Sequence, residues 1–327
     1  MGLEDPAIVH AWACPLEDKP FPLENFAAIK QARAAGHLVW VHLNRAQAKS
    51  RDYLTELLKD HDPLLVDALT AEDTRPRVEP VGKGALVMLR GANLNPGAEA
   101  HDLVNLRIWA EDRMIISVRT RRLRLVKEVV QRLQKGKMVD DGASLLGMLI
   151  DRLLRNLEPI IHGLDADVDA METRVMEKPD SALRKDIVAI RTKSIELRRF
   201  IAPQKDMMGR LRVVGEHFIG ADDRFLYQEL HDMSVRLVEE LDSVRERAAV
   251  LQDELTNALA DKLNKRLYLL SVVAAIFLPL GFLTGLLGIN VGGIPMTESP
   301  YGFWLVSGAM TTLVLGQVVL FRYLRWF

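Results

Sequence analysis

The pattern of hydrophobic and polar positions divides the chain into two parts that meet near residue 121. Before that point, short apolar runs rich in β-branched and aromatic residues indicate strands at 8–13, 38–43, 85–94, 103–110 and 114–119. Apolar residues spaced by three and four predict amphipathic helices at 46–58 and 63–69. A polar break at 111–113 predicts a hairpin between the last two strands. The N-terminal part is therefore expected to be an α/β sandwich.

The second part reads as helical almost to its end, with helices predicted at 122–135, 143–177, 180–208 and 222–288. In the last of these, apolar residues alternate steps of four and three, a heptad seam that packs on another helix; they are Leu237, Leu241, Val244, Ala248, Leu251 and Leu255. No Pro or Gly occurs between residues 229 and 275, so one helix is expected to run from the soluble part into a membrane.

Acidic residues gather along one face of the helix predicted at 143–177, namely Asp165, Asp167, Asp169, Glu172 and Glu177. Two interpretations are open. The face is either an ordinary solvated surface or a surface that concentrates or senses cations.

Two stretches near the C-terminus, 267–287 and 303–321, contain 21 and 19 residues without a formal charge. At about 1.5 Å per residue, each is long enough to cross a hydrocarbon core of roughly 30 Å. Lys262, Lys265 and Arg266 precede the first span, and Arg322 and Arg325 follow the second. By the positive-inside rule, both ends of this pair are expected in the cytoplasm, with the linker outside.

Composition narrows the class of function. The 43 basic and 44 acidic residues give a net charge of −1, which offers no reason to expect a nucleic-acid partner. The single cysteine, Cys14, has no intrachain partner for a disulfide and is expected to be a buried, inert thiol.

No phosphate-binding Gly-rich loop, nucleophile elbow or metalloprotease motif is found, so neither an enzyme nor a cofactor is predicted. None of the eight His lies after His231, so tight zinc ligation within the spans is not expected.

The first span is the better candidate for a pore wall, because polar groups in hydrocarbon are costly unless they face protein or water. A stripe recurs every seven residues, formed by Asn257, Asn264, Ser271, Leu278 and Gly285. Further candidates on this span are Ala274, Gly281 and Thr284. Two helices alone cannot enclose an aqueous path, so a water-facing stripe implies a homo-oligomer. The alternatives are a plain two-helix anchor and, for Gly281 and Gly285, close helix packing.

The first span ends in Gly288-Ile289-Asn290, and a short loop and a second span with a basic, aromatic end follow. This arrangement resembles the CorA family of divalent-cation channels and transporters. CorA magnesium channels typically carry Gly-Met-Asn at this position. The Ile289 substitution and the following Val-Gly-Gly-Ile-Pro at 291–295 resemble the zinc-transporting ZntB branch.

The resemblance implies a fold and an assembly: a funnel-shaped homopentamer in the bacterial inner membrane with an α/β/α cytoplasmic domain. The implied segments are a cytoplasmic domain (1–221), a stalk (222–266), a first transmembrane helix (267–290), a periplasmic loop (291–302), a second transmembrane helix (303–321) and a cytoplasmic tail (322–327).

The resemblance also implies roles for single residues. Gly288, Ile289 and Asn290 would form the outer selectivity motif, and Asn264 would lie at the inner mouth. Leu270, Ala274 or Leu278 would form apolar constrictions. Glu298, the only charged residue between 267 and 321, is either a solvated loop acid or an outer-mouth group that attracts cations.

The implied substrate is zinc, with cadmium, nickel and cobalt as further candidates, and Asn amides would contact a hydrated or partly hydrated ion. The ZntB branch suggests coupling to a proton gradient, for which the spans contain no carboxylate or His. The alternatives are a magnesium or cobalt channel of the wider CorA group and a membrane-anchored sensor that does not transport.

Overall fold

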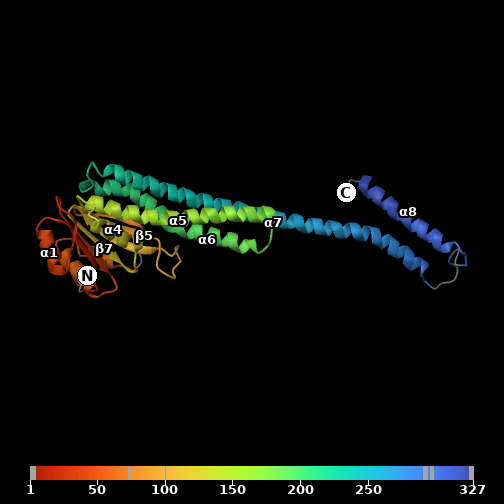
Figure 1. Ribbon diagram of the computed structural model, residues 1–327, viewed down its shortest axis with the longest axis horizontal. Coiled ribbons are helices and arrows are strands. Elements are labelled where there is room, and N and C mark those ends of the chain that lie inside the picture. Colours follow the sequence, from red (N-terminus) through yellow and green to blue (C-terminus); the bar gives the residue numbers. More distant parts are fainter. Residues whose placement is uncertain (1–4, 73–74, 100, 290–293, 295–297, 324–327) are drawn as a thin grey trace. The chain divides into compact units, whose positions relative to one another are not determined.

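The computed structural model describes residues 5–72, 75–99, 101–289, 294 and 298–323 and divides into two compact units, Met1–Asp253 and Glu254–Phe327. The first unit is built on one mixed sheet of seven strands in the order β2-β1-β3-β7-β6-β5-β4 (Figure 1). The strands are β1 (Ile8–Cys14), β2 (Phe21–Pro22), β3 (Leu38–Asn44), β4 (Arg77–Val81), β5 (Gly84–Gly91), β6 (Val104–Glu111) and β7 (Met114–Arg119). Neighbours pair antiparallel except β3 and β7, which are parallel.

Side chains alternate between the two faces of the sheet, and each face is buried under helices. On one face, Val39, Val41 and Ile116 join a cluster completed by α1 (Phe26–Ala34), α2 (Lys49–Leu57) and α3 (Leu64–Thr70). On the other face, Trp40 and Ile115 join the larger cluster with α4 (Arg124–Gln134), α5 (Gly142–Glu177), α6 (Leu183–Val214) and the beginning of α7 (Arg224–Leu287). The predicted α/β sandwich is confirmed.

The predicted hairpin is confirmed by the antiparallel pairing of Glu111 with Met114. The prediction missed β2, β4 and α1, and α6 continues past its predicted end at 208 to Val214, where a short 3-10 turn (Gly215–His217) follows. Strand β4 is short and contains Pro80, which lacks the amide hydrogen of a ladder, and β4 lies at the sheet edge where Pro is tolerated. Edge strand β2 has only two residues, one of them Pro22.

Helix α1 escaped the pattern because it has few large apolar residues, although its ends carry clear signals. The Asn25 side chain accepts the Ala28 N–H at 2.9 Å as an N-cap. Just past its C-terminus, Gly36 has a φ of +78°, a conformation that Gly adopts without the Cβ penalty.

Helices α5, α6 and α7 pack along one another in the first unit (Figure 1). The predicted heptad seam of α7 is buried at every position, and Leu237, Leu241 and Val244 belong to the larger core cluster. Tyr227 on α7 is fully buried and donates its hydroxyl to the Ala143 carbonyl at 2.9 Å, where α5 begins. The seam therefore packs on the helices of its own chain.

The second unit contains the end of α7 and helix α8 (Gly302–Tyr323), both long and apolar enough to cross a membrane. Helix α7 is continuous through Pro279, as the prediction of one helix entering the membrane requires.

Candidate functional site

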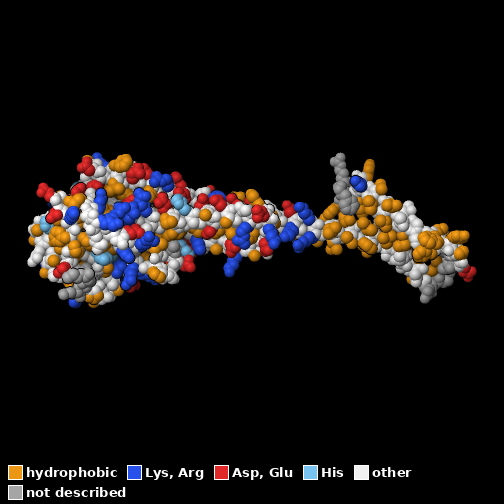
Figure 2. Space-filling model, viewed as in Figure 1, with side chains coloured by type: hydrophobic (Ala, Val, Ile, Leu, Met, Phe, Trp, Pro, Cys, Tyr) orange, Lys and Arg blue, Asp and Glu red, His pale blue; other side chains and the backbone are white. Residues whose placement is uncertain are grey.

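The apolar windows of α7 and α8 are almost entirely uncovered: 6% of the α7 window and none of the α8 window is buried within the chain. Figure 2 shows apolar side chains gathered over these two helices, in contrast to the mixed charges on the first unit. Leu278 and Phe282, for example, are 71% and 69% exposed. So much exposed apolar surface is stable only in lipid or against other protein chains.

The predicted stripe lies on the exposed side of α7. The side chains of Asn257, Asn264, Ser271 and Leu278 are exposed, and so are Gly281, Thr284 and Gly285, whereas Ala274 is half-buried. Val272 is the buried residue of this stretch, and Phe321 is the buried residue of α8. Because nearly all described residues of this stretch are uncovered, exposure does not single out the candidate pore residues, and their role stays a prediction.

A side-chain hydrogen bond joins α8 to α7 in the described part of the spans. Pro279 has no amide hydrogen, so the Ala275 carbonyl lacks its usual helical donor. Gln317 on α8 supplies a donor instead, because its Nε2–H bonds to this carbonyl at 3.2 Å. The signal in the sequence was an amide side chain in an otherwise aliphatic span, where interhelical hydrogen bonds are the usual use of such groups.

The hydroxyl groups on the free side of α7 bond to their own helix. Ser271 donates to the Leu267 carbonyl at 2.8 Å, and Thr284 donates to the Leu280 carbonyl at 3.0 Å. Each hydroxyl hydrogen is therefore occupied, and the oxygen lone pairs remain to accept hydrogen bonds from water. Ser271, a member of the predicted stripe, thus offers an acceptor that suits the water shell of a cation, whereas Thr284 lies about 140° round the helix from it.

The glycines of this stretch have different surroundings. A Cβ added at Gly281 or Gly285 would meet nothing within 4 Å, so neither glycine is needed for packing on α8. A Cβ at Gly288 would lie 2.9 Å from the Thr284 carbonyl, which accepts the Gly288 N–H where the helix ends. Close packing through Gly281 and Gly285 therefore requires a second copy of the chain.

The C-terminal end of the candidate site is described only in part. Ile289 is exposed, and Glu298 is exposed in a turn before α8. Asn290, on which the predicted selectivity motif depends, lies outside the described residues, as do residues 291–293 and 295–297.

Among the described residues, no group of three or more His, Cys, Asp or Glu is arranged to hold a metal ion. His42 is fully buried, with its Nδ1 2.8 Å from the Ser117 hydroxyl, and burial holds its pKa well below the ordinary value. Cys14 is buried, and burial raises the pKa of its thiol to about 12, which makes it a poor ligand and nucleophile. These side chains have packing roles.

Three of the five acidic residues predicted on one face of α5 contact an arginine, whereas Asp167 and Glu177 are exposed. Arg247 on α7 donates to Asp165 at 2.7 Å and to Glu172 at 3.0 Å, and it also contacts Asp169. The hydrogen bonds that Arg247 donates to Asp169 and then to Glu172 raise its pKa above the ordinary value, so it stays charged. The sequence did not reveal this three-carboxylate contact, because the arginine lies about 80 residues away along the chain.

A family model described as "CorA-like Mg2+ transporter protein" matches residues 35–323, nearly the whole chain. The chain belongs to the CorA family. It is 36% identical over 290 residues to the "Divalent cation transporter CmaX" of Pseudomonas aeruginosa, which covers 88% of this chain and 87% of that protein. It is 34% identical over 289 residues to the "Zinc transport protein ZntB" of Yersinia enterocolitica, with the same coverage.

The CorA fold extends over both units of the chain. The solved structure of full-length CmaX matches with a TM-score of 0.81 at 32% identity and covers 99% of each chain. The predicted family, and the predicted fold of a mixed-sheet domain followed by a long helix and two apolar C-terminal helices, are both confirmed.

Proposed function

We propose that this CorA-family protein transports divalent metal cations across a bacterial inner membrane, with zinc as its main substrate. The observation that carries the proposal is that α8 leaves the predicted stripe of α7 uncovered, with Asn257 and Asn264 before the span and Ser271 within it. An anchor would gain nothing from water-accepting groups on its membrane surface, whereas a pore requires them. Relatives named as a zinc transporter and a divalent cation transporter support the same class of substrate.

The proposed assembly is a homopentamer with both ends of each chain in the cytoplasm. Copies of α7 surround the ion path, and copies of α8 form an outer ring in contact with lipid. Gly281 and Gly285 have open surroundings in the single chain and would allow neighbouring α7 helices to approach closely. We assign 1–221 to the cytoplasmic domain, 222–266 to the stalk, 267–290 and 303–321 to the spans, 291–302 to the periplasmic loop and 322–327 to the tail.

In this proposal the ion passes with much of its water shell. No carboxylate is found among the described residues of the spans, so the cost of removing the water shell from the ion would not be offset. Rings of Asn290 at the outer end and Asn264 at the inner end would contact the shell by hydrogen bonds, with Gly288 and Ile289 completing the outer motif. Glu298 would raise the local concentration of cations at the mouth.

The test is ion flux into proteoliposomes that contain the purified full-length protein. We expect zinc flux that exceeds magnesium flux, measured with and without an imposed pH gradient. Asn290→Ala should reduce this flux strongly, while Ser299→Ala in the same outer segment should leave it unchanged. A dominant magnesium flux would favour the magnesium or cobalt channel, and no flux of either ion through intact protein would favour the sensor.

Assembly is tested separately by mass measurement in detergent. Five subunits are expected for wild type and for Asn290→Ala, so a loss of flux in the variant reports on the pore. A monomer would contradict the pore as proposed, because two helices do not enclose a path for ions.

A further inference from the structure

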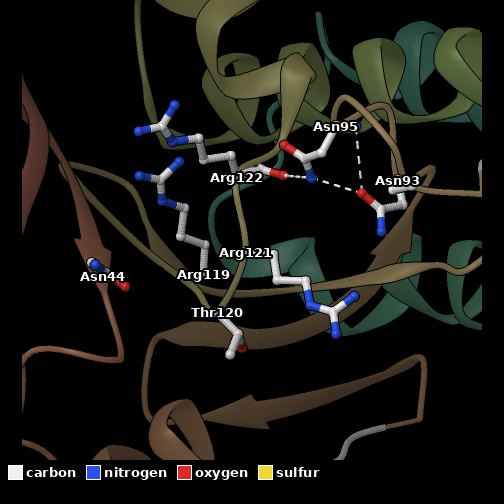
Figure 3. Close-up of a pocket in the computed structure, with 8 residues that line it drawn as sticks. Asn44, Asn93, Asn95, Arg119, Thr120, Arg121 and Arg122 are labelled. Atoms are coloured by element: carbon white, nitrogen blue, oxygen red, sulfur yellow. Dashed lines mark hydrogen bonds between the residues drawn. The ribbon is translucent and has the colours of Figure 1, made fainter.

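A pocket of about 460 Å³ lies in the first unit (Figure 3). Its polar lining comes from Asn44, Asn93, Asn95, Arg119, Arg121 and Arg122. These residues meet there for a topological reason. Strands β3 and β7 are parallel, and two antiparallel pairings in succession make β5 run the same way as β7. The C-terminal ends of β3, β5 and β7 therefore lie at the same end of the sheet. Open α/β sheets commonly bind ligands at the C-terminal ends of their strands.

Two of the three arginines have no neutralising partner in the described structure. Figure 3 shows the guanidinium groups of Arg119 and Arg122 extending side by side, with Arg121 turned another way. Arg121 is paired with Asp102 at 3.0 Å. For Arg119 and Arg122, no guanidinium hydrogen bond or ion pair is found to any residue in the described part of the chain.

This arrangement is electrostatically unfavourable in the empty protein. Partial burial, followed by repulsion from Arg122, lowers the pKa of Arg119. Arg119 is partly buried and lies beside a second positive charge, the exposed Arg122, so an anion bound between them would reduce both the repulsion and the cost of burying Arg119.

Hydrogen bonds hold the loops of the pocket in place. The Asn95 Nδ2 group donates to Asn93 Oδ1 at 2.6 Å and to the Arg122 carbonyl at 3.0 Å (Figure 3). The loop after β5 is thereby fixed to the chain after β7, which positions Arg122. On the other side, Asn44 Oδ1 accepts the Ala46 N–H at 3.2 Å, leaving the Asn44 amide NH2 as the group available to a ligand.

The strands below the pocket are also joined by side chains. Trp40 Nε1 donates to Ser117 Oγ at 2.9 Å, and His42 Nδ1 lies 2.8 Å from the same oxygen, all within the buried core. This contact links β3 and β7 two residues before Asn44 and Arg119. Asn44 and Arg119 therefore extend from a rigid part of the sheet.

We propose that this pocket binds a phosphate group, either as the free ion or carried by a small metabolite. Guanidinium groups match phosphate oxygens with paired hydrogen bonds, and two unneutralised arginines match a doubly charged phosphate. A volume of about 460 Å³ exceeds the needs of the bare ion and is in the range of small-molecule sites. The proposal concerns a site apart from the ion path, so it stands or falls independently of transport.

The test is isothermal titration of the full-length protein in detergent with inorganic phosphate and with AMP, at fixed ionic strength. Wild type should bind at least one of them saturably. Arg119→Gln and Arg122→Gln should each weaken binding about tenfold or more, since each removes a charged donor. Arg184→Gln, an exposed arginine on α6, is the matched control and should bind as wild type does. Tighter binding of AMP would identify a metabolite, and equal or tighter binding of inorganic phosphate would identify the free ion.

Melting temperature without ligand separates binding from folding. Because Arg119 and Arg122 repel each other, each variant should melt at or above the wild-type temperature. The proposal is overturned if neither compound binds saturably at millimolar concentration, or if the Arg119 and Arg122 variants bind as tightly as the control.

Discussion

The contact of Arg247 with three carboxylates makes a quantitative prediction about how α5 and α7 are held together. Arg247→Met keeps the aliphatic stem and removes the charge, leaving Asp165, Asp169 and Glu172 facing one another. Their side chains are 48%, 63% and 36% exposed, so each pair falls in the range of about 0.2–1 kcal/mol measured for exposed pairs. Together the three ion pairs contribute about 1–3 kcal/mol to the free energy of unfolding. At roughly 2–4 °C per kcal/mol for a domain of this size, the melting temperature should fall by about 2–12 °C.

The assay is thermal unfolding of the full-length protein in detergent, followed by near-UV circular dichroism. Arg236→Met is the control, because Arg236 is an exposed arginine on the same helix. Raising the salt to about 1 M should reduce the difference between Arg247→Met and wild type, since the screening length falls to about 3 Å. Millimolar magnesium should stabilise Arg247→Met more than wild type, because only the variant has unneutralised carboxylates there. Equal melting temperatures for the two variants at low salt would refute the reasoning.

Three further predictions follow from other contacts. Burial, and then a neighbouring aspartate, raise the pKa of Asp223, so its ionised form is disfavoured in the fold. Asp223→Asn should therefore raise the melting temperature at pH 7, and the gain should disappear below the ordinary Asp pKa of about 3.9. Gln317→Leu leaves the Ala275 carbonyl without its donor and should destabilise the detergent-solubilised protein by about 0.6–1.7 kcal/mol, whereas Thr312→Val, which loses only a bond within α8, should cost less. Glu298→Gln should reduce zinc flux most at low ion concentration and low salt, and an effect independent of both would argue against attraction of cations at the mouth.

The sequence predicted the long helices well because their apolar spacing repeats over many turns. Helix α5 was expected at 143–177 and is found at Gly142–Glu177, and α7 was expected at 222–288 and is found at Arg224–Leu287. In α1 and β4 the signal was local and weak. Helix α1 is marked only by an N-cap and a following Gly, and β4 is a short edge strand that contains Pro80.

The role of the candidate site stays a prediction, and its side-chain contacts could not be predicted from the sequence. The polar stripe of α7 follows from a seven-residue repeat and lies on the exposed side of the helix. The partners of Ala275 and of the acidic face could not be predicted, since they come from residues 42 and about 80 positions away in the chain. Those pairings depend on how helices pack in three dimensions. The phosphate pocket was missed for the same reason, because its residues come together only at the edge of the folded sheet.

The two outer strands of the sheet have a consequence for how copies of the protein recognise one another. An outer strand with free amide hydrogens invites the strand of a neighbour, which leads to fused sheets and aggregates. Here one outer strand has two residues and the other loses a donor at Pro80, so neither offers a long template. Sheets of neighbouring copies should therefore not pair, even where many copies crowd at a membrane surface. Contacts between copies should be made by the helices.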